Sequence, residues 1–342
     1  MDFEQYKQWR DDILVRYEVP SENRFDCLNP FKAMDFARRR GDGHEKSPAG
    51  GLGTKAGAEW RRLLLHGLDK DNLHFEPTRG VRSALGCLFE RASQEGREVW
   101  LPEDVYPFYR KEASERAPDL DIRYFRTLPS LDLSGLNAAA DNAVILVTDP
   151  LTPTGKFLGR PERSMLEAWT MGARDRWVVF DSVYLYDWRL PSHFRDGISG
   201  GRTIHLLSMS KSWLLRGVFG FAVGPEQGSD WWKHLGLLPD EGAESAALDA
   251  LTSDPFMPTR QERVFAREWA RRRGKLERFG AVTPKDGTGY FRRMNVNFER
   301  AFKENGLLLV PASVFGSGLD DWSVATCLYE ASAKSSDITV LA

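Results

Sequence analysis

Short runs of apolar residues alternate along the chain with longer segments whose apolar residues recur at helical spacing. The runs are too short for helices and are rich in β-branched and aromatic residues, which favours strands. Because whole runs are apolar, rather than every second residue, we expect strands buried on both faces, as in a parallel sheet. The predicted strands are Val99–Leu101, Ala143–Val147, Trp177–Phe180, Thr203–Leu207 and Phe219–Val223.

Helical patterns precede and separate these strands. Trp60, Leu63, Leu64 and Leu68 recur at helical spacing, and Val81–Glu90 carries helix formers directly after a break at Pro77–Gly80. Strands that alternate with helices indicate an α/β layer. The sequence therefore predicts an α/β fold, in which a large domain has a mostly parallel sheet flanked by helices.

The pattern changes from about residue 226 onward. Trp231, Trp232, Trp269 and the solvated run Arg271–Arg273 are expected in long helical stretches. Two further strands are expected after these helices. They are Tyr290–Val296 and Leu307–Val310, and they predict a smaller C-terminal α/β domain.

These changes divide the chain into three parts. Residues 1–57 are predicted to be an N-terminal arm and part of the small domain, because Arg38–Gly43 and Gly50–Gly53 are typical of loops. Residues 58–225 are predicted to form the large domain. Residues 226–342 are predicted to form connecting helices and the small C-terminal domain.

Charge and cysteine content narrow the environment. The chain has 47 basic and 49 acidic residues, a net charge of -2, so no basic excess points to nucleic acid or a membrane surface. Its 3 cysteines are widely spaced and fit no metal site, which favours a reducing compartment. No apolar run reaches the roughly 20 residues that span a bilayer. We expect a cytoplasmic protein without nucleic-acid or membrane partners.

Polar residues follow several predicted strands where those strands end. Asp149 and Asp181 each follow one, Lys211 follows Thr203–Leu207 within a few positions, and Gly80 precedes a helix. In open parallel sheets, ligands bind at the carboxyl ends of the strands. We therefore expect one crevice to gather these segments.

The segments together resemble the class I/II aminotransferase superfamily of pyridoxal 5'-phosphate (PLP) enzymes, called fold type I. The resemblance runs from about Gly57 to Ala331. The family's Ser-x-Ser-Lys segment matches Ser208, Ser210 and Lys211, which makes Lys211 the Schiff-base lysine. Its Asp-x-x-Tyr segment matches Asp181, which would keep the pyridine nitrogen protonated, and Tyr184, which would bond the phenolic oxygen.

The resemblance also implies where the cofactor is held. Thr78–Arg82 is similar to the family's glycine-containing turn at a helix N-terminus, so Gly80, Val81 and Arg82 are expected at the phosphate. Ser208 matches a further phosphate ligand. Tyr106 matches the aromatic residue that stacks on the pyridine ring.

The sequence departs from the family pattern at three places. Thr152 stands where the family has an asparagine that bonds the phenolic oxygen. Phe219 stands where a phosphate-binding arginine is usual, which leaves Arg216 and Arg82 as alternatives for that contact. The C-terminal strand around Val324 lacks the arginine that grips the substrate carboxylate, so the substrate is gripped differently or is not an ordinary α-amino acid.

The resemblance implies a homodimeric PLP-dependent enzyme that acts on an amino acid or amine, with aminotransferase chemistry as the leading expectation. The missing arginine keeps open a lyase, cyclase, decarboxylase or oxidase of specialised metabolism. A non-catalytic PLP-binding sensor is the third alternative. Neither the substrate nor the reaction outcome follows from the sequence.

Overall fold

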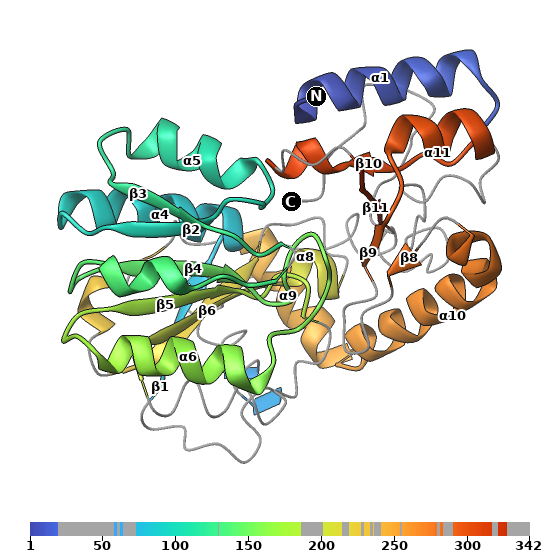
Figure 1. Cartoon of the computed structure of the whole chain (residues 1–342). Helices are drawn as coiled ribbons and strands as arrows, with labels where there is room; N and C mark the ends of the chain where they lie inside the picture. The colour runs from blue at the N-terminus through green and yellow to red at the C-terminus, as the bar shows by residue number, and fades with distance from the viewer. Residues whose placement is uncertain are drawn as a thin grey trace.

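A computed structural model describes most of the chain. The described residues are 1–19, 58–59, 62–63, 73–128, 130–185, 201–213, 219–226, 229–232, 235, 241–253, 255–278, 281–282, 290–316 and 321–326. They form two units, each built around its own sheet, with the larger unit on the left of Figure 1.

The larger sheet has the strand order β1-β7-β6-β5-β4-β2-β3. Strands β3, β2, β4, β5 and β6 run parallel to one another, whereas β7 is antiparallel to both β6 and β1. The predicted α/β fold with a mostly parallel sheet is therefore confirmed. The strands are β1 (Leu73–Thr78), β2 (Val99–Pro102), β3 (Ile122–Phe125), β4 (Val144–Thr148), β5 (Trp177–Asp181), β6 (Thr203–Ser208) and β7 (Gly220–Pro225).

Two strands of this sheet were not predicted, and both lie at its edges. β3 exposes its two central residues, Arg123 and Tyr124, so it lacks the continuous apolar run of a buried strand. β1 is half-buried and contains Pro77, which the sequence marks as a break. Proline is tolerated at a sheet edge, because an edge strand leaves one row of backbone groups unpaired.

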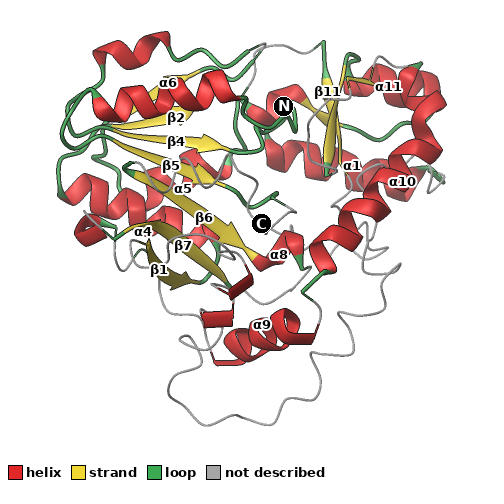
Figure 2. Cartoon of the chain, turned by 90° about the horizontal axis from the view of Figure 1, so that it is seen from below, coloured by secondary structure: helices red, strands yellow, loops and turns green. Residues whose placement is uncertain are grey.

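Helices cover both faces of the large sheet, as Figure 2 shows. In β4, Val144 and Leu146 pack in the same core as α4 (Val81–Gln94) and α5 (Phe108–Arg116). Ile145 and Val147 pack on the other face with α6 (Arg160–Met171). Successive side chains of a strand point to opposite faces, so a continuous apolar run supplies two cores at once.

The connection to the second unit is helical. Its long helices are α9 (Glu241–Ser253) and α10 (Met257–Glu277), and α10 carries Trp269 and an exposed Arg273 as expected. Trp231 and Trp232 were expected in a long helix, and this prediction is wrong. They lie in and directly after a short 3-10 turn and pack in the same core as α4. The shorter helical segments are η3 (Ser134–Ala138), α8 (Met209–Ser212), η4 (Ser229–Trp231) and η5 (Ala312–Phe315).

The second unit holds an antiparallel sheet with the order β10-β11-β9-β8. The expected strand at Tyr290–Val296 is present as a shorter β9. The expected strand at Leu307–Val310 is instead confined to Val310–Pro311, because Leu307–Leu309 are buried in the core without forming a ladder. The elements are β8 (Ala281–Val282), β9 (Phe291–Met294), α11 (Phe298–Asn305), β10 (Val310–Pro311) and β11 (Ser323–Thr326).

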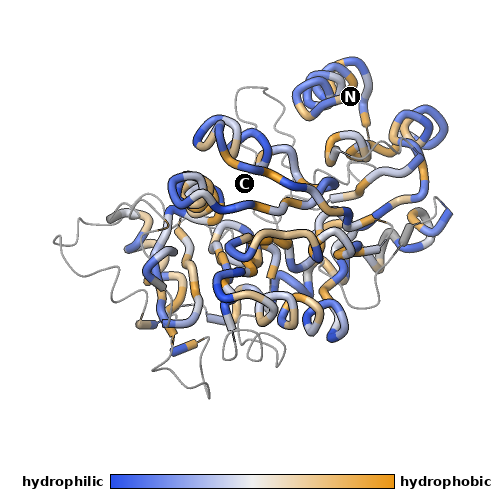
Figure 3. Tube along the Cα trace, turned by 60° about the vertical axis from the view of Figure 1, so that its left-hand side comes forward, coloured by the Kyte–Doolittle hydropathy of each residue, from blue (hydrophilic) through white to orange (hydrophobic). Residues whose placement is uncertain are grey.

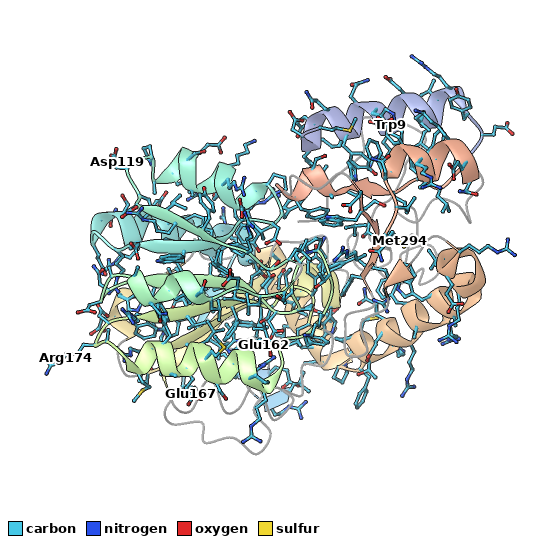
Figure 4. All side chains as sticks on the ribbon, viewed as in Figure 1. Trp9, Asp119, Glu162, Glu167, Arg174 and Met294 are labelled. Carbon is cyan, nitrogen blue, oxygen red and sulfur yellow. The ribbon has the colours of Figure 1, made fainter. Side chains whose placement is uncertain are left out.

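The N-terminal helix α1 (Phe3–Arg16) packs on this second unit, beside α11 in Figure 1. Hydrophilic and hydrophobic positions alternate along it (Figure 3), and its Trp9, labelled in Figure 4, faces α11. The Trp9 ring lies edge-on to Phe298 and Phe302, with centroids 5.0 and 5.7 Å away. The start of the chain is therefore joined to a segment near its other end.

Several predictions fall on residues outside the described ranges. Of the helix expected around Leu63, residues 58–59 and 62–63 are described and are helical. The loop-like stretches Arg38–Gly43 and Gly50–Gly53 lie outside, and the domain boundaries at 57 and 225 stay predictions. Among the helices that the structure describes, none is long and apolar enough to cross a membrane.

Candidate active site

A cavity of about 110 Å³ lies between the two units, at the carboxyl ends of the parallel strands. This volume is several times the roughly 10–15 Å³ that one water molecule needs, so the cavity can take an organic ligand. The residues predicted for the site that line it are Val81, Arg82, Tyr106, Thr152, Asp181, Tyr184 and Lys211.

The topology of the sheet brings these residues together. β2 and β4 are neighbours, yet the chain leaves them in opposite directions, towards β3 and towards β5. Tyr106 and Thr152 follow these two strands, so they lie at the point where the strand order switches. Open α/β sheets bind their ligands at this point.

Lys211 lies in α8, directly after β6, and its side chain is only 3% exposed. Burial lowers the pKa of its amine to about 7, the positive charge of Arg82 lowers it as well, and Asp181 acts in the opposite direction. The hydroxyl of Tyr290 donates a hydrogen bond of 2.7 Å to the Lys211 carbonyl oxygen, which ties the second unit to α8. A buried amine with a pKa this low is present near pH 7 in large part as the neutral form, which is the nucleophile.

Asp181 is the last residue of β5, next to the strand that precedes Lys211. Its Oδ1 accepts a 3.0 Å hydrogen bond from the Val183 backbone N–H, and its Oδ2 accepts one from the Tyr109 hydroxyl. Burial raises the pKa of the carboxyl to about 6, although both bonds and the Lys211 charge favour the ionised form. The carboxylate is thus oriented on both oxygens inside the cavity.

Aromatic side chains surround these two charges. The Lys211 Nζ lies 6.0 Å from the ring centroid of Tyr184, whose hydroxyl has a pKa raised by burial. Tyr106 lines the cavity from the segment after β2, and burial raises its pKa to about 12. Both hydroxyls are therefore neutral hydrogen-bond donors at physiological pH. The Tyr106 ring also lies edge-on to Phe3 of α1, at 5.4 Å.

The N-terminus of α4 opens beside the cavity. Gly80 is the N-cap residue, with φ 85°, and it makes no side-chain cap. Gly220 faces Gly80, and the space between them cannot hold a side chain. A Cβ on Gly220 would lie 2.2 Å from the Leu207 carbonyl oxygen and 3.0 Å from the Gly80 Cα. The first turn of α4 thus keeps uncapped N–H groups, which suit an anion.

Arg82 brings a positive charge to the same end of α4. Its guanidinium lies 3.9 Å from the ring centroid of Phe108, and both side chains line the cavity. No carboxylate among the described residues forms a salt bridge with it. A stacked guanidinium with free N–H groups can bind a phosphate or a carboxylate.

The two serines before Lys211 are buried but do not line the cavity. The Ser208 Oγ accepts a 3.2 Å bond from the Ser210 backbone N–H and lies 2.9 Å from the Ser210 Oγ. Their hydroxyls therefore bond one another and cap α8. Gly80 likewise borders the cavity without lining it.

The segment after β4 contributes unevenly. Thr152 lines the cavity with Pro153, and the Thr152 backbone N–H donates to the Thr148 Oγ1 at 2.9 Å. Asp149 instead bonds Arg163 at 2.5 Å, away from the cavity. Asp149 was expected in the crevice, but it stabilises the loop that precedes α6. Arg216 lies outside the described residues.

The second unit closes the cavity with an almost entirely apolar wall. The wall residues are Phe291, Val310, Phe315, Val324 and Thr326. As expected from the sequence, Val324 of β11 brings no charge to this side.

Sequence reasoning missed three contacts that support the site. Tyr109 bonds Asp181, Phe108 stacks on Arg82, and Tyr290 bonds the backbone of Lys211. The aromatic cluster Tyr106–Tyr109 was the available signal for two of them. Tyr290 carried no signal, because its partner lies 79 positions away.

Comparison with known proteins gives relatives of the fold. Neither the models of protein families nor the curated proteins give a match. Among solved structures, YbdL from Escherichia coli, reported with a methionine aminotransferase function, is 16% identical, with 92% of this chain and 87% of that chain aligned and a TM-score of 0.66. A probable N-succinyldiaminopimelate aminotransferase from Thermus thermophilus is 18% identical, with 95% of both chains aligned and a TM-score of 0.67.

An aminotransferase from Staphylococcus aureus gives the same result, with 19% identity, 92% of this chain and 87% of that chain aligned, and a TM-score of 0.66. Identities this low carry the likeness of the backbone and not the likeness of the reaction. The chain therefore has the aminotransferase fold, fold type I of the PLP-dependent enzymes.

Proposed function

We propose that this protein is a PLP-dependent enzyme that acts on the amino group of an amino acid or amine, with transamination as the leading reaction. One observation carries the proposal. Lys211, whose pKa is lowered to about 7, and Asp181, which accepts hydrogen bonds on both oxygens, are buried in one cavity. They lie at the ends of neighbouring strands. Perturbed titratable groups that share a cavity are typical of active sites.

The residues of the cavity fit PLP. Its phosphate would take the uncapped N-terminus of α4 and the guanidinium of Arg82, with Arg216 as the alternative cation. Asp181 would keep the pyridine nitrogen protonated. Tyr184 and Thr152 would form hydrogen bonds with the phenolic oxygen. The aromatic ring of Tyr106, which lines the cavity, would stack on the pyridine ring. Ser208 and Ser210 would join the phosphate only after giving up their mutual bond.

When bound, PLP supplies an electrophilic carbonyl carbon and a ring that accepts electrons. The neutral amine of Lys211 would hold the cofactor covalently. Its free amine would accept the proton of the substrate α-carbon as a general base and return a proton as a general acid. Asp181 would hold the ring nitrogen, and the hydrogen bonds to both of its oxygens favour its ionised form.

Spectroscopy of the purified protein tests the proposal. Protein incubated with PLP should show the visible absorption band of a lysine-bound cofactor, and borohydride reduction followed by peptide mass spectrometry should find it on Lys211. Lys211→Ala should lose the band, whereas the exposed-lysine control Lys111→Ala should keep it. A wild-type protein without the band would contradict the proposal.

The reaction is identified by its products. An amine panel that yields a carbonyl product together with the aminated cofactor supports transamination. Ammonia, carbon dioxide or peroxide would instead identify a lyase, decarboxylase or oxidase. A cofactor that binds without responding to any amine would identify a sensor. We also propose a homodimer, which light scattering at micromolar concentration tests.

A further inference from the structure

The wall of the cavity that faces the large sheet is formed by paired positions of the small sheet. Val310 of β10 is paired with Val324 of β11, and Phe291 of β9 is paired with Thr326 of β11. All four line the cavity, and Phe315 of η5 joins them. Directly paired residues of antiparallel strands point to the same face, so this apolar wall is a property of the sheet and not of one side chain.

The wall residues are buried. Val324 is 2% exposed, Val310 2%, Phe291 4%, Thr326 7% and Phe315 8%. A ligand group that touches this wall therefore meets four hydrocarbon side chains and one hydroxyl, away from bulk water. An apolar group gains from that contact, whereas a carboxylate loses its hydration without a charged partner.

Two arginines of β9 lie near this wall, and neither lines the cavity. Arg292 of β9 places its guanidinium 5.1 Å from the Trp269 ring centroid and donates to the Phe291 carbonyl oxygen at 2.9 Å. Arg293 is paired with Val324 and so shares the wall's face of the sheet, but its guanidinium lies 5.5 Å from the Trp322 ring centroid and does not line the cavity. Among the described residues, the cations that line the cavity are Arg82 and Lys211, and both come from the large-sheet side.

Arg82 and Lys211 have other partners under the proposed function, since the first binds phosphate and the second binds the cofactor carbon. We infer that the group of the substrate facing the wall of Phe291, Val310, Phe315, Val324 and Thr326 is uncharged and apolar. The substrate is therefore a primary amine whose reacting carbon carries hydrocarbon, and not an α-amino acid with a free carboxylate at that position. The inference rests on the proposed function and names its substrate class.

Matched pairs of ligands test the inference on the wild-type holoprotein. Each pair differs only in the carboxylate: 2-phenylethylamine against L-phenylalanine, and 3-methylbutylamine against L-leucine. Spectral titration of the cofactor gives the half-saturating concentration of each ligand. We expect the half-saturating concentration of each amine to be at least ~10-fold lower than that of the paired amino acid. A preformed pocket typically discriminates by this much against a group of the wrong polarity.

A substitution at the wall tests the cause of the preference. Val324→Arg places a guanidinium on the strand where the family carries its arginine, and it should shift the ratio towards the amino acids by ~10- to 100-fold, the range of a charge-assisted hydrogen bond. Glu304→Arg, which adds an arginine on the exposed side of α11 away from the cavity, should leave the ratio unchanged. The wild-type ratio decides the inference even if Val324→Arg fails to fold.

Two results would overturn the inference. Amino acids that bind as tightly as their paired amines would contradict it, and a loss of that binding in Arg293→Gln would identify Arg293 as the carboxylate partner. A purified protein without any cofactor band would overturn the proposed function and this inference with it. The two failures are distinguishable, because the first requires a normal cofactor band.

Discussion

The Tyr109 hydroxyl donates a hydrogen bond to the Asp181 Oδ2, joining the first turn of α5 to the end of β5. The Val183 backbone N–H occupies the other carboxylate oxygen, at 3.0 Å. The carboxylate is consequently fixed in orientation before any ligand arrives. A pre-oriented charge is more effective than a mobile one, because it needs no rearrangement during the reaction.

Tyr109→Phe should destabilise the cofactor-free protein by roughly 1.5–3 kcal/mol near neutral pH, the range for a hydrogen bond to a charged group. The bond lowers the pKa of Asp181 from a value that burial has raised, so its loss raises that pKa further. The destabilisation should therefore shrink as the pH falls through about 6, where the wild-type carboxyl becomes neutral.

Denaturant unfolding at about pH 5 and about pH 7.5 measures this difference. The control is Tyr124→Phe, since Tyr124 is 46% exposed and should change little at either pH. An equal loss of stability at both pH values would show that the hydroxyl acts without regard to the carboxylate charge.

Lys211→Met should stabilise the cofactor-free protein at pH 6. The folded state holds the Lys211 pKa at about 7, below its ordinary value of 10.5, so protonation of the buried amine opposes folding. This cost is complete below the folded pKa and disappears as the pH rises towards the unfolded one. The gain should be on the order of 1–4 kcal/mol near pH 6 and should vanish near pH 10.

Unfolding midpoints of the apoprotein across this range give the measurement. Lys111→Met is the matched control, because the Lys111 side chain is 69% exposed. A stability difference for Lys211→Met that does not depend on pH would mean that the lysine is not desolvated.

Arg82→Gln should weaken the binding of PLP by about 10- to 100-fold, the loss expected for a charge-assisted contact. Pyridoxal, which lacks the phosphate, should bind both proteins equally. Equilibrium dialysis with the two ligands measures both affinities. Equal losses for PLP and pyridoxal would place Arg82 at another part of the ligand and favour Arg216 for the phosphate.

Gly220→Ala should prevent normal folding or cost more than ~3 kcal/mol, because the added methyl would lie 2.2 Å from the Leu207 carbonyl oxygen. The backbone of β6 cannot move away without breaking its ladder with β7. Gly274→Ala is the matched control. Gly274 lies in α10 with open space around the added methyl, so the change should stabilise the protein by up to about 1 kcal/mol.

Thermal unfolding compares the two alanine variants with the wild type. A Gly220→Ala protein as stable as the wild type would show that β6 and β7 can separate at this position.

Most of the large sheet could be predicted, because its central strands are continuous apolar runs. Asp181 and Lys211 follow from the same signal, since each comes just after such a run. The edge strand β3 could not be predicted in this way, because Arg123 and Tyr124 face solvent. An edge strand is held in the sheet by backbone hydrogen bonds, which do not require an apolar pattern of side chains.

The parts of the site that depend on distant packing were out of reach of the sequence. Tyr109 and Asp181 are 72 positions apart, and their contact requires α5 to lie over the end of β5. The sequence shows that the strand around Val324 lacks an arginine, but it does not show which side chains form the apolar wall of the cavity. Phe291 and Thr326 meet only through the register of two four-residue strands.

The position of β11 in the small sheet has a consequence for synthesis on the ribosome. β11 is the last strand described along the chain, yet it lies between β10 and β9 and supplies two residues to the cavity wall. Domains form in order as the chain emerges, so Lys211 and Asp181 are in place while their cavity is still open on one side. Trp9 of α1, which precedes both sheets in the chain, must likewise wait for Phe298 and Phe302. Loading of the site is therefore expected after release of the chain, and ribosome-bound chains halted before residue 323 should not retain a ligand there.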